Sequence, residues 1–173
     1  MYKKLIRLFP DYPQKGINFV DWMPVTGNPE AFSQLIDDMV AMVKDVKIDK
    51  VAGLESRGFL LGVPMAERLG VGFVPVRKKG KLPGKCLAQE YELEYGKETI
   101  EIQEDALLPG EHVLIVDDLI ATGGTMEAAN ELVSRITTNI TDAFFIELTD
   151  VKGTEMLTRP CLSLLKMREK DEV

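Results

Sequence analysis

The most informative stretch of the chain is Val113-Leu-Ile-Val-Asp-Asp-Leu-Ile-Ala-Thr-Gly-Gly-Thr125. Its first four residues form an uninterrupted apolar run, which is typical of a central parallel strand covered on both faces. Two adjacent carboxylates, Asp117 and Asp118, follow that run, and a small glycine-rich turn follows them. Beyond the turn, apolar residues recur at helical spacing. The stretch therefore predicts a strand whose carboxyl end carries two acids, then a tight turn and a helix.

The same alternation of strands and helices extends to both sides of this stretch. Strands are predicted at 51–54, 72–76, 143–148 and 162–165. Helices are predicted after the start signal Asn28-Pro29 and over 59–69, where Gly70 ends the second one. This alternation predicts an α/β fold with a parallel-rich twisted sheet that is flanked by helices on both faces.

A hairpin is predicted in the middle of the chain. In residues 91–95 and 99–103 the type of side chain alternates from one residue to the next, and Gly96-Lys97 lies between the two segments. That arrangement is typical of two antiparallel strands joined by a short turn. We therefore expect the turn of the hairpin at Gly96-Lys97.

Composition limits the classes of protein to which the chain can belong. Its 173 residues suit one domain, at roughly 150 residues per domain. With 21 basic and 28 acidic side chains the net charge is -7, so general nucleic-acid binding is not favoured.

Cys86 and Cys161 lack metal-type spacing and are expected to be free thiols of a reducing compartment. No signal-peptide pattern or membrane-length apolar run is visible, so we expect a cytoplasmic protein without membrane contact.

The turn after the two carboxylates has the chemistry of an anion site. Ligands of parallel α/β sheets bind beyond the carboxyl ends of the strands. The backbone N–H groups of the turn, aided by the helix dipole and two hydroxyls, are suited to one phosphate, and the carboxylates beside them to sugar hydroxyls. The residues concerned are Ala121, Thr122, Gly123, Gly124 and Thr125. The alternative is an acidic strand end with a flexible turn that binds nothing. The pattern is neither a Walker motif nor G-x-G-x-x-G, so it does not favour ATP or a dinucleotide.

A second strand-to-helix loop, Gly53-Leu-Glu-Ser-Arg-Gly58, carries a cation. The guanidinium of Arg57 is always charged and is suited to bind a phosphate or a pyrophosphate. Taken alone, an arginine near a helix start is usually an ordinary surface residue. The place of Arg57 beside the first loop favours the binding role.

Together, these residues carry a family resemblance. The 113–125 stretch resembles the signature for 5-phosphoribosyl-1-pyrophosphate (PRPP) of type I phosphoribosyltransferases. Further segments are similar, in order, to motifs of the adenine-specific members: Gly53–Phe59, Arg77–Gly84, Tyr91–Lys97, Glu147–Thr149 and Lys152-Gly153. The resemblance extends from Phe9-Pro10 to Leu162–Leu165. It implies a single domain over 1–173 with the type I phosphoribosyltransferase fold, a base-pocket segment at about 1–30 and a flexible catalytic loop or hairpin at about 80–103 that lies over the site.

The resemblance also implies a reaction of purine salvage, in which adenine and PRPP give AMP and pyrophosphate with Mg²⁺. In this family Asp117 and Asp118 would bind the ribose hydroxyls, and the turn from Ala121 to Thr125 the 5′-phosphate. Arg57 would bind pyrophosphate and act in catalysis, next to a non-proline cis peptide at Glu55-Ser56. Mg²⁺ would be held mainly by PRPP or pyrophosphate near the two aspartates, without a direct protein ligand.

The resemblance assigns acid–base chemistry to the predicted hairpin. Glu94 matches the position at which the family has a carboxylate that accepts a proton from adenine, and Tyr95 would pack beside the ligand. Closure of such a loop would exclude water from the reacting sugar. The sequence pattern alone favours an exposed hairpin with alternating glutamates.

A run of cations follows the predicted 72–76 strand. Arg77, Lys78 and Lys81 are expected to attract the polyphosphate of PRPP, together with Lys79, from this chain or across a dimer interface. The alternative is a solvated basic loop with no ligand.

The expected base pocket departs from the family pattern. Its candidate residues are Phe19, Val20, Leu119 and Ile120. The segment Phe19-Val-Asp-Trp-Met-Pro24 stands where the family usually has Phe, a basic residue, Asp, Ile, Ser or Thr, and Pro. The departures are Val20, Trp22 and Met23, and Trp22 is expected to serve the core.

Other functions share parts of this pattern. A phosphoribosyltransferase for another purine, such as xanthine, would keep the PRPP site and change the pocket. A non-enzymatic regulator that senses PRPP would reuse the fold, although such regulators tend to carry a basic nucleic-acid face. A receiver-like signalling domain would use the acidic pair for Mg²⁺ but would not require the Thr-Gly-Gly-Thr turn. We expect the enzyme, as a homodimer with adenine and PRPP as its small-molecule partners.

Overall fold

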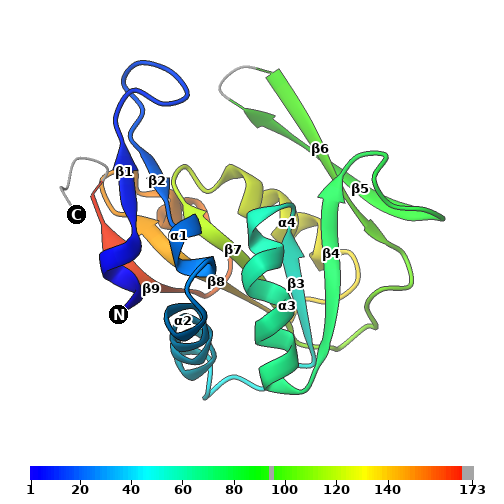
Figure 1. The fold of residues 1–173 in the computed structure, drawn as a ribbon. Coiled ribbons are helices and arrows are strands. Elements are labelled where there is room, and N and C mark those ends of the chain that lie inside the picture. Colours follow the sequence, from blue (N-terminus) through cyan, green and yellow to red (C-terminus); the bar gives the residue numbers. More distant parts are fainter. Residues whose placement is uncertain (94–95, 169–173) are drawn as a thin grey trace.

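The computed structural model describes residues 1–93 and 96–168. A seven-stranded sheet crosses the molecule (Figure 1). In sheet order its strands are β5 (Cys86–Leu93), β6 (Gly96–Gln103), β4 (Gly72–Lys78), β3 (Lys50–Leu54), β7 (Val113–Ile120), β8 (Ile140–Leu148) and β9 (Cys161–Met167). The five strands from β4 to β9 are parallel, and β5 and β6 add an antiparallel hairpin at one edge. The predicted α/β class and parallel-rich sheet are confirmed.

The order of the parallel strands places a ligand site between β3 and β7. The chain passes from β3 outward to β4 and then returns to add β7 on the other side of β3, so the winding direction reverses there. In open α/β sheets the crevice at this reversal is where ligands bind. The pairing of β3 with β7 ends at Gly53 and Val116, so the two strands part at the acidic pair.

Strand β7 is longer than the sequence predicted. The sequence placed Asp117 and Asp118 after the strand, but both lie within it, and β7 continues to Ile120. The reason is that β8 extends beside β7 as far as Glu147 and supplies it with a pairing partner after β3 has ended. The two acids therefore stand on a strand rather than on a loop.

Helices cover both faces of the sheet. On one face α2 (Pro29–Met42) and α3 (Arg57–Leu69) pack over apolar side chains such as Val51 and Leu114. On the other, α4 (Gly124–Ser134) packs over their strand neighbours, among them Ala52 and Ile115. Successive strand residues point to opposite faces, so the continuous apolar run of β7 fills both cores. No helix within 1–93 or 96–168 is both long and apolar enough to span a membrane.

The predicted helix signals are confirmed. The Asn28 side chain accepts a hydrogen bond of 2.9 Å from the Ala31 backbone N–H, and Pro29 occupies the first helical position of α2. Gly70 ends α3 with a φ of 68°, a left-handed conformation that glycine adopts without steric cost.

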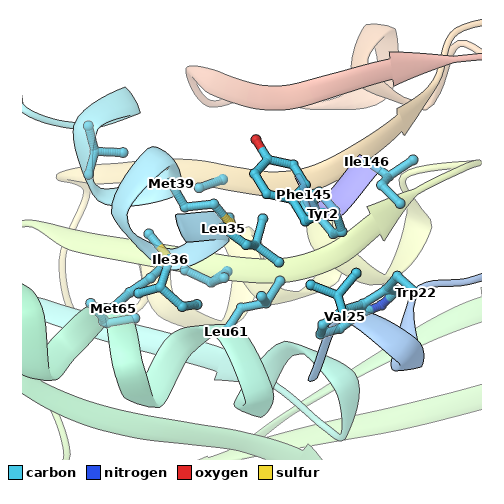
Figure 2. Packing of buried hydrophobic residues seen from close by; sticks show 14 of the residues in the cluster. Tyr2, Trp22, Val25, Leu35, Ile36, Met39, Leu61, Met65, Phe145 and Ile146 are labelled. Carbon is cyan, nitrogen blue, oxygen red and sulfur yellow. The ribbon is translucent and has the colours of Figure 1, made fainter. Parts of the chain in front are cut away.

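The N-terminal segment, for which the sequence predicted no regular elements before Asn28, forms four short ones. They are the 3-10 helix η1 (Tyr2–Leu5), strands β1 (Arg7–Phe9) and β2 (Phe19–Asp21), and helix α1 (Met23–Thr26). Figure 2 shows that Trp22 and Val25 of this segment belong to the same apolar core as Leu61 of α3 and Phe145 of β8. The segment is thereby fixed against the sheet. A second 3-10 helix, η2 (Gly153–Met156), follows β8.

The hairpin is present, but its predicted turn is wrong. Gly96 and Lys97 lie within β6, where they pair with Leu93 and Glu92 of β5. The pairing of Tyr91 with Glu98 fixes this register. The predicted site residues Glu94 and Tyr95 lie outside the described residues.

One core carboxylate has incomplete hydrogen bonding. Asp142 of β8 is 0% exposed and accepts a hydrogen bond of 2.8 Å from the Asn130 side chain of α4. Its other oxygen, Oδ1, has no hydrogen-bond partner in the described part of the chain, and neither has Asn130 Oδ1. Burial raises the pKa of Asp142 to about 7.

We expect Asp142→Asn to stabilise the protein above neutral pH. The unfolded chain releases the Asp142 proton near its ordinary pKa of 3.8, whereas the folded chain keeps it until about 7. Folding stability therefore falls as pH rises through that window. At about pH 8 the variant should gain at least about 1 kcal/mol in free energy of unfolding, because asparagine carries no charge to bury. Urea unfolding at about pH 5 and about pH 8 measures this, and equal gains at both values would contradict the account.

Candidate active site

A cavity of about 400 Å³ opens where β3 and β7 part. Its wall combines the β3–α3 loop, β4, the β5–β6 hairpin, β7 and the start of α4. Its polar lining residues are Glu55, Ser56, Arg57, Lys78, Tyr91, Glu98, Asp117, Asp118 and Thr125, and its apolar ones are Leu54, Val76, Ile100 and Leu119. The cavity therefore brings together segments that are far apart in the sequence, and it lies where the strand order reverses between β3 and β7.

The two acids have different surroundings. Asp118 is 3% exposed, and its Oδ2 accepts a hydrogen bond from Trp22 Nε1 at 2.6 Å and forms an ion pair with Arg57 Nε at 2.9 Å. Asp117 is partly exposed, and its Oδ1 accepts a hydrogen bond of 2.9 Å from the Asp118 backbone N–H. Burial, with the negative charge of Asp118 beside it, raises the pKa of Asp117 well above its ordinary value. Asp118 is therefore ion-paired, and Asp117 binds a proton more readily than an ordinary aspartate does.

Arg57 is fixed at the first residue of α3. Besides its ion pair with Asp118, its guanidinium lies over the Phe19 ring, 5.3 Å from the centroid. The preceding Glu55–Ser56 peptide bond is cis, as the resemblance implied. Gly58 allows α3 to approach β7, since a Cβ at that position would lie 2.7 Å from the Val116 carbonyl oxygen.

The cations of β4 are paired with carboxylates. Arg77 donates two hydrogen bonds to Glu55, at 2.9 and 3.1 Å, which lower the pKa of that carboxyl below its ordinary value. Lys78 Nζ donates to Glu98 at 2.6 Å, and this contact lowers the pKa of Glu98. The Tyr91 hydroxyl donates to the other Glu98 oxygen at 2.9 Å. A bound polyphosphate would therefore have to share these cations with their carboxylate partners or displace the carboxylates.

The glycine-rich turn forms a second cavity of about 150 Å³ beside the first. Gly123 has a φ of 85° and begins α4 as its N-cap. The turn is supported from behind by Gly153, where a Cβ would lie well inside contact distance of the Ala121 carbonyl oxygen and 2.8 Å from the Gly123 nitrogen. The turn stands at a helix N-terminus, which is suited to bind a phosphate.

The structure brings most, but not all, of the predicted residues together. Arg57, Lys78, Asp117, Asp118, Leu119 and Thr125 line the first cavity, and Asp117, Leu119, Ile120, Ala121, Thr122, Gly123, Gly124 and Thr125 line the second. Arg77, Lys81, Phe19 and Val20 line neither. Phe19 contacts the site through Arg57, and Val20 is buried in the core.

Three residues acquire a place in the site that the sequence did not indicate. Trp22 was expected in the core only, and its indole N–H also reaches Asp118 across 96 residues of sequence. Tyr91 and Glu98 join Lys78 because of the hairpin register, which the misplaced turn concealed. Alternation within the two strands gave a signal for both, and Tyr91 also lies in the Tyr91–Lys97 segment that resembles a family motif.

Comparisons with known proteins agree with this geometry. A family model described as phosphoribosyl transferase domain matches residues 27–139. The adenine phosphoribosyltransferase of Dinoroseobacter shibae is 53% identical over 153 residues, which cover 88% of this chain and 86% of the relative. The crystal structure of the Saccharomyces cerevisiae adenine phosphoribosyltransferase, complexed with D-2,5-dideoxy-2,5-imino-altritol 1,6-bisphosphate and adenine, matches with a TM-score of 0.92 at 46% identity, covering 95% of this chain and 96% of that one. The enzyme from Thermoanaerobacter pseudethanolicus matches with a TM-score of 0.93 at 46% identity, covering 96% and 98%.

Proposed function

The chain belongs to the phosphoribosyltransferase family, and from that premise we infer that it is an adenine phosphoribosyltransferase. It transfers the 5-phosphoribosyl group from PRPP to adenine, which gives AMP and pyrophosphate. The observation that carries this conclusion is the meeting of the acidic pair with the glycine-rich turn in two adjoining cavities, in a chain about half identical to relatives of that name.

The phosphoribosyl group is bound by β7 and the turn that follows it. The 5′-phosphate accepts hydrogen bonds from backbone N–H groups of residues 121–125 and from the hydroxyls of Thr122 and Thr125. Asp117 and Asp118 accept hydrogen bonds from the ribose hydroxyls. Two cavities that share Asp117, Leu119 and Thr125 suit a ligand with a phosphate at one end and a sugar beside it.

The pyrophosphate leaving group is stabilised by cations. When the bond from the sugar carbon C1′ to pyrophosphate breaks, negative charge accumulates on the leaving oxygens and positive charge on the sugar. Arg57 and Lys78 line the cavity and supply the nearest positive charges. Arg77 and Lys81 flank it and raise the local concentration of the polyphosphate. Arg57, Arg77 and Lys78 are each paired with a carboxylate, so each must be shared between that carboxylate and the incoming phosphates.

Mg²⁺ is the proposed cofactor. The residues of the site suit an ion that is held mainly through the substrate rather than by several direct protein ligands. Within 1–93 and 96–168 no cluster of three His, Cys, Asp or Glu side chains could hold a metal ion. One oxygen of Asp118 is already used by Trp22 and Arg57. The ion would be held mainly by pyrophosphate oxygens, beside Asp117, which lines both cavities. When bound, it neutralises charge on the leaving group.

Adenine attacks C1′ through N9 and loses a ring proton, so a base is required. We assign that role to Glu94, which lies outside the described residues, with Tyr95 beside the ligand. Leu119 lines both cavities and is the apolar candidate for one face of the adenine ring.

Assembly and compartment are part of the proposal. The outer face of α3 exposes Leu60 and Val63, which suits a contact with a second copy of the chain in a homodimer. Light scattering at low concentration tests this, and a monomer would contradict it. Cys86 and Cys161 are free thiols, as expected for a cytoplasmic enzyme.

The substrate is tested with a panel of purine bases. The chain is supplied with PRPP and Mg²⁺, and with adenine, hypoxanthine, guanine or xanthine in separate reactions. Nucleotide formation with adenine alone is the expected result. Turnover of another base at a comparable rate would contradict the adenine assignment, and PRPP binding without turnover of any base would indicate a regulator.

A further inference from the structure

Asp118 has two partners on a single oxygen. Trp22 Nε1 donates a hydrogen bond to Oδ2 at 2.6 Å, and Arg57 Nε forms an ion pair with the same atom at 2.9 Å. Asp118 is almost fully buried, and Trp22 is fully buried. A buried carboxylate that loses its donors incurs a large energetic cost, so each of these contacts matters to the position of Asp118.

The core holds the indole of Trp22 rigidly. Its ring packs edge-to-face against Phe145 at 5.7 Å between centroids and 84° between planes. Figure 2 shows Trp22 beside Val25, at the end of the core opposite Met65. Because the ring cannot turn, the direction of its N–H is set by packing. The core thus determines where the Asp118 oxygen lies.

The two partners differ in what else they can bind. Arg57 is charged, lines the cavity and is the proposed ligand of pyrophosphate. Trp22 is neutral and does not line the cavity, and within 1–93 and 96–168 its N–H donates to no acceptor other than Asp118. When the guanidinium of Arg57 turns to the phosphates, the indole N–H stays on Asp118 and keeps that carboxylate satisfied.

We propose that Trp22 is a positioning residue for the transfer reaction. Its indole N–H holds Asp118 in the cavity wall and allows Arg57 to be shared between Asp118 and the pyrophosphate of PRPP. This inference rests on the proposed function, since it assigns PRPP to the cavity. It also gives a role to a residue that departs from the usual family sequence at this position.

Trp22→Phe tests the proposal, because phenylalanine keeps an aromatic ring against Phe145 and removes the N–H. We expect the KM and the Kd for PRPP to rise about tenfold, the typical effect of losing a hydrogen bond to a charged group. The KM for adenine at saturating PRPP should change less than twofold. Met65→Ala is the matched control: it opens a cavity at the far end of the same core, away from Trp22, and should lower the melting temperature while leaving the Kd for PRPP within twofold.

A double-mutant cycle shows whether Trp22 acts through Asp118. In an Asp118→Ala background, Trp22→Phe should have no further effect on the Kd for PRPP. An equal tenfold effect in both backgrounds, or a Kd unchanged by Trp22→Phe alone, would overturn the proposal. Calorimetric titration with PRPP does not need turnover, so an inactive chain would refute the proposed function without deciding the role of Trp22.

The fluorescence emission of Trp22 gives a second test, which uses protein that keeps this tryptophan. Trp22 is the only tryptophan, so the indole emission reports on this position alone. We expect the emission to change in Asp118→Ala and on addition of PRPP. An emission spectrum that is the same in all three samples would contradict the contact.

Discussion

Gly153→Ala should lower kcat/KM for PRPP about a thousandfold, the largest effect expected of any single substitution in this chain. A Cβ at position 153 would meet the Ala121 carbonyl oxygen inside contact distance, and the Gly123 nitrogen at 2.8 Å. All of these are backbone atoms, which cannot rotate away as a side chain can. The turn must therefore move, and several phosphate-binding N–H groups move with it. Loss of one preorganised donor of this kind already costs about a hundredfold or more.

The control for this variant is Gly27→Ala. Gly27 has a φ of −78° at the end of α1, and its added Cβ would make only an ordinary contact of 3.6 Å with the Pro24 carbonyl oxygen. Initial rates at low PRPP measure the effect, with circular dichroism to verify that both variants fold. A folded Gly153→Ala protein whose kcat/KM stays within threefold of the parent would mean that the turn does not bind the 5′-phosphate.

Glu94→Gln should reduce kcat about a hundredfold or more, the usual range for a lost general base. Glutamine keeps the size of the side chain and can still donate or accept a hydrogen bond, but it cannot take the proton that adenine releases. The KM for PRPP should change little, because the pyrophosphate and phosphate contacts lie on other residues.

Glu92→Gln is the matched control, since Glu92 is an exposed carboxylate of the same hairpin, opposite Lys97. It should retain the kcat of the parent. Steady-state kinetics with adenine as the varied substrate compares the two. A near-normal kcat in Glu94→Gln would remove Glu94 from the mechanism and would require another base.

The fold was largely predictable because its signals are local. The apolar run 113–116, the Asn28-Pro29 start and the Gly70 stop each act within a few residues, and all three are confirmed. The end of β7 was mispredicted because β8, a separate segment, supplies the pairing that extends it to Ile120. The hairpin turn was misplaced because Gly96-Lys97 has turn chemistry, while cross-strand pairing sets the actual register.

The parts of the site that lie in one continuous segment were predictable from the sequence. The contacts between distant segments were not. The acidic pair and the turn are contiguous in sequence, and the cavities contain both as expected. The partners of the charges come from elsewhere: Trp22 for Asp118, Glu55 for Arg77, and Glu98 for Lys78. Such contacts depend on three-dimensional packing, and local spacing gives no signal for them. For the same reason Val20, expected in the base pocket, lies in the core instead.

The central claim is that adenine is phosphoribosylated at the acidic pair where β3 and β7 part. The most direct test compares the rate of AMP formation from adenine, PRPP and Mg²⁺ by the parent chain and by the paired variant Asp117→Asn/Asp118→Asn. The account predicts AMP formation by the parent and a loss of more than about tenfold in kcat/KM for PRPP in the folded variant, since the contact of the ion-paired Asp118 with the ribose is a charge-assisted hydrogen bond. A parent chain that makes no AMP, or a variant as active as the parent, would contradict it.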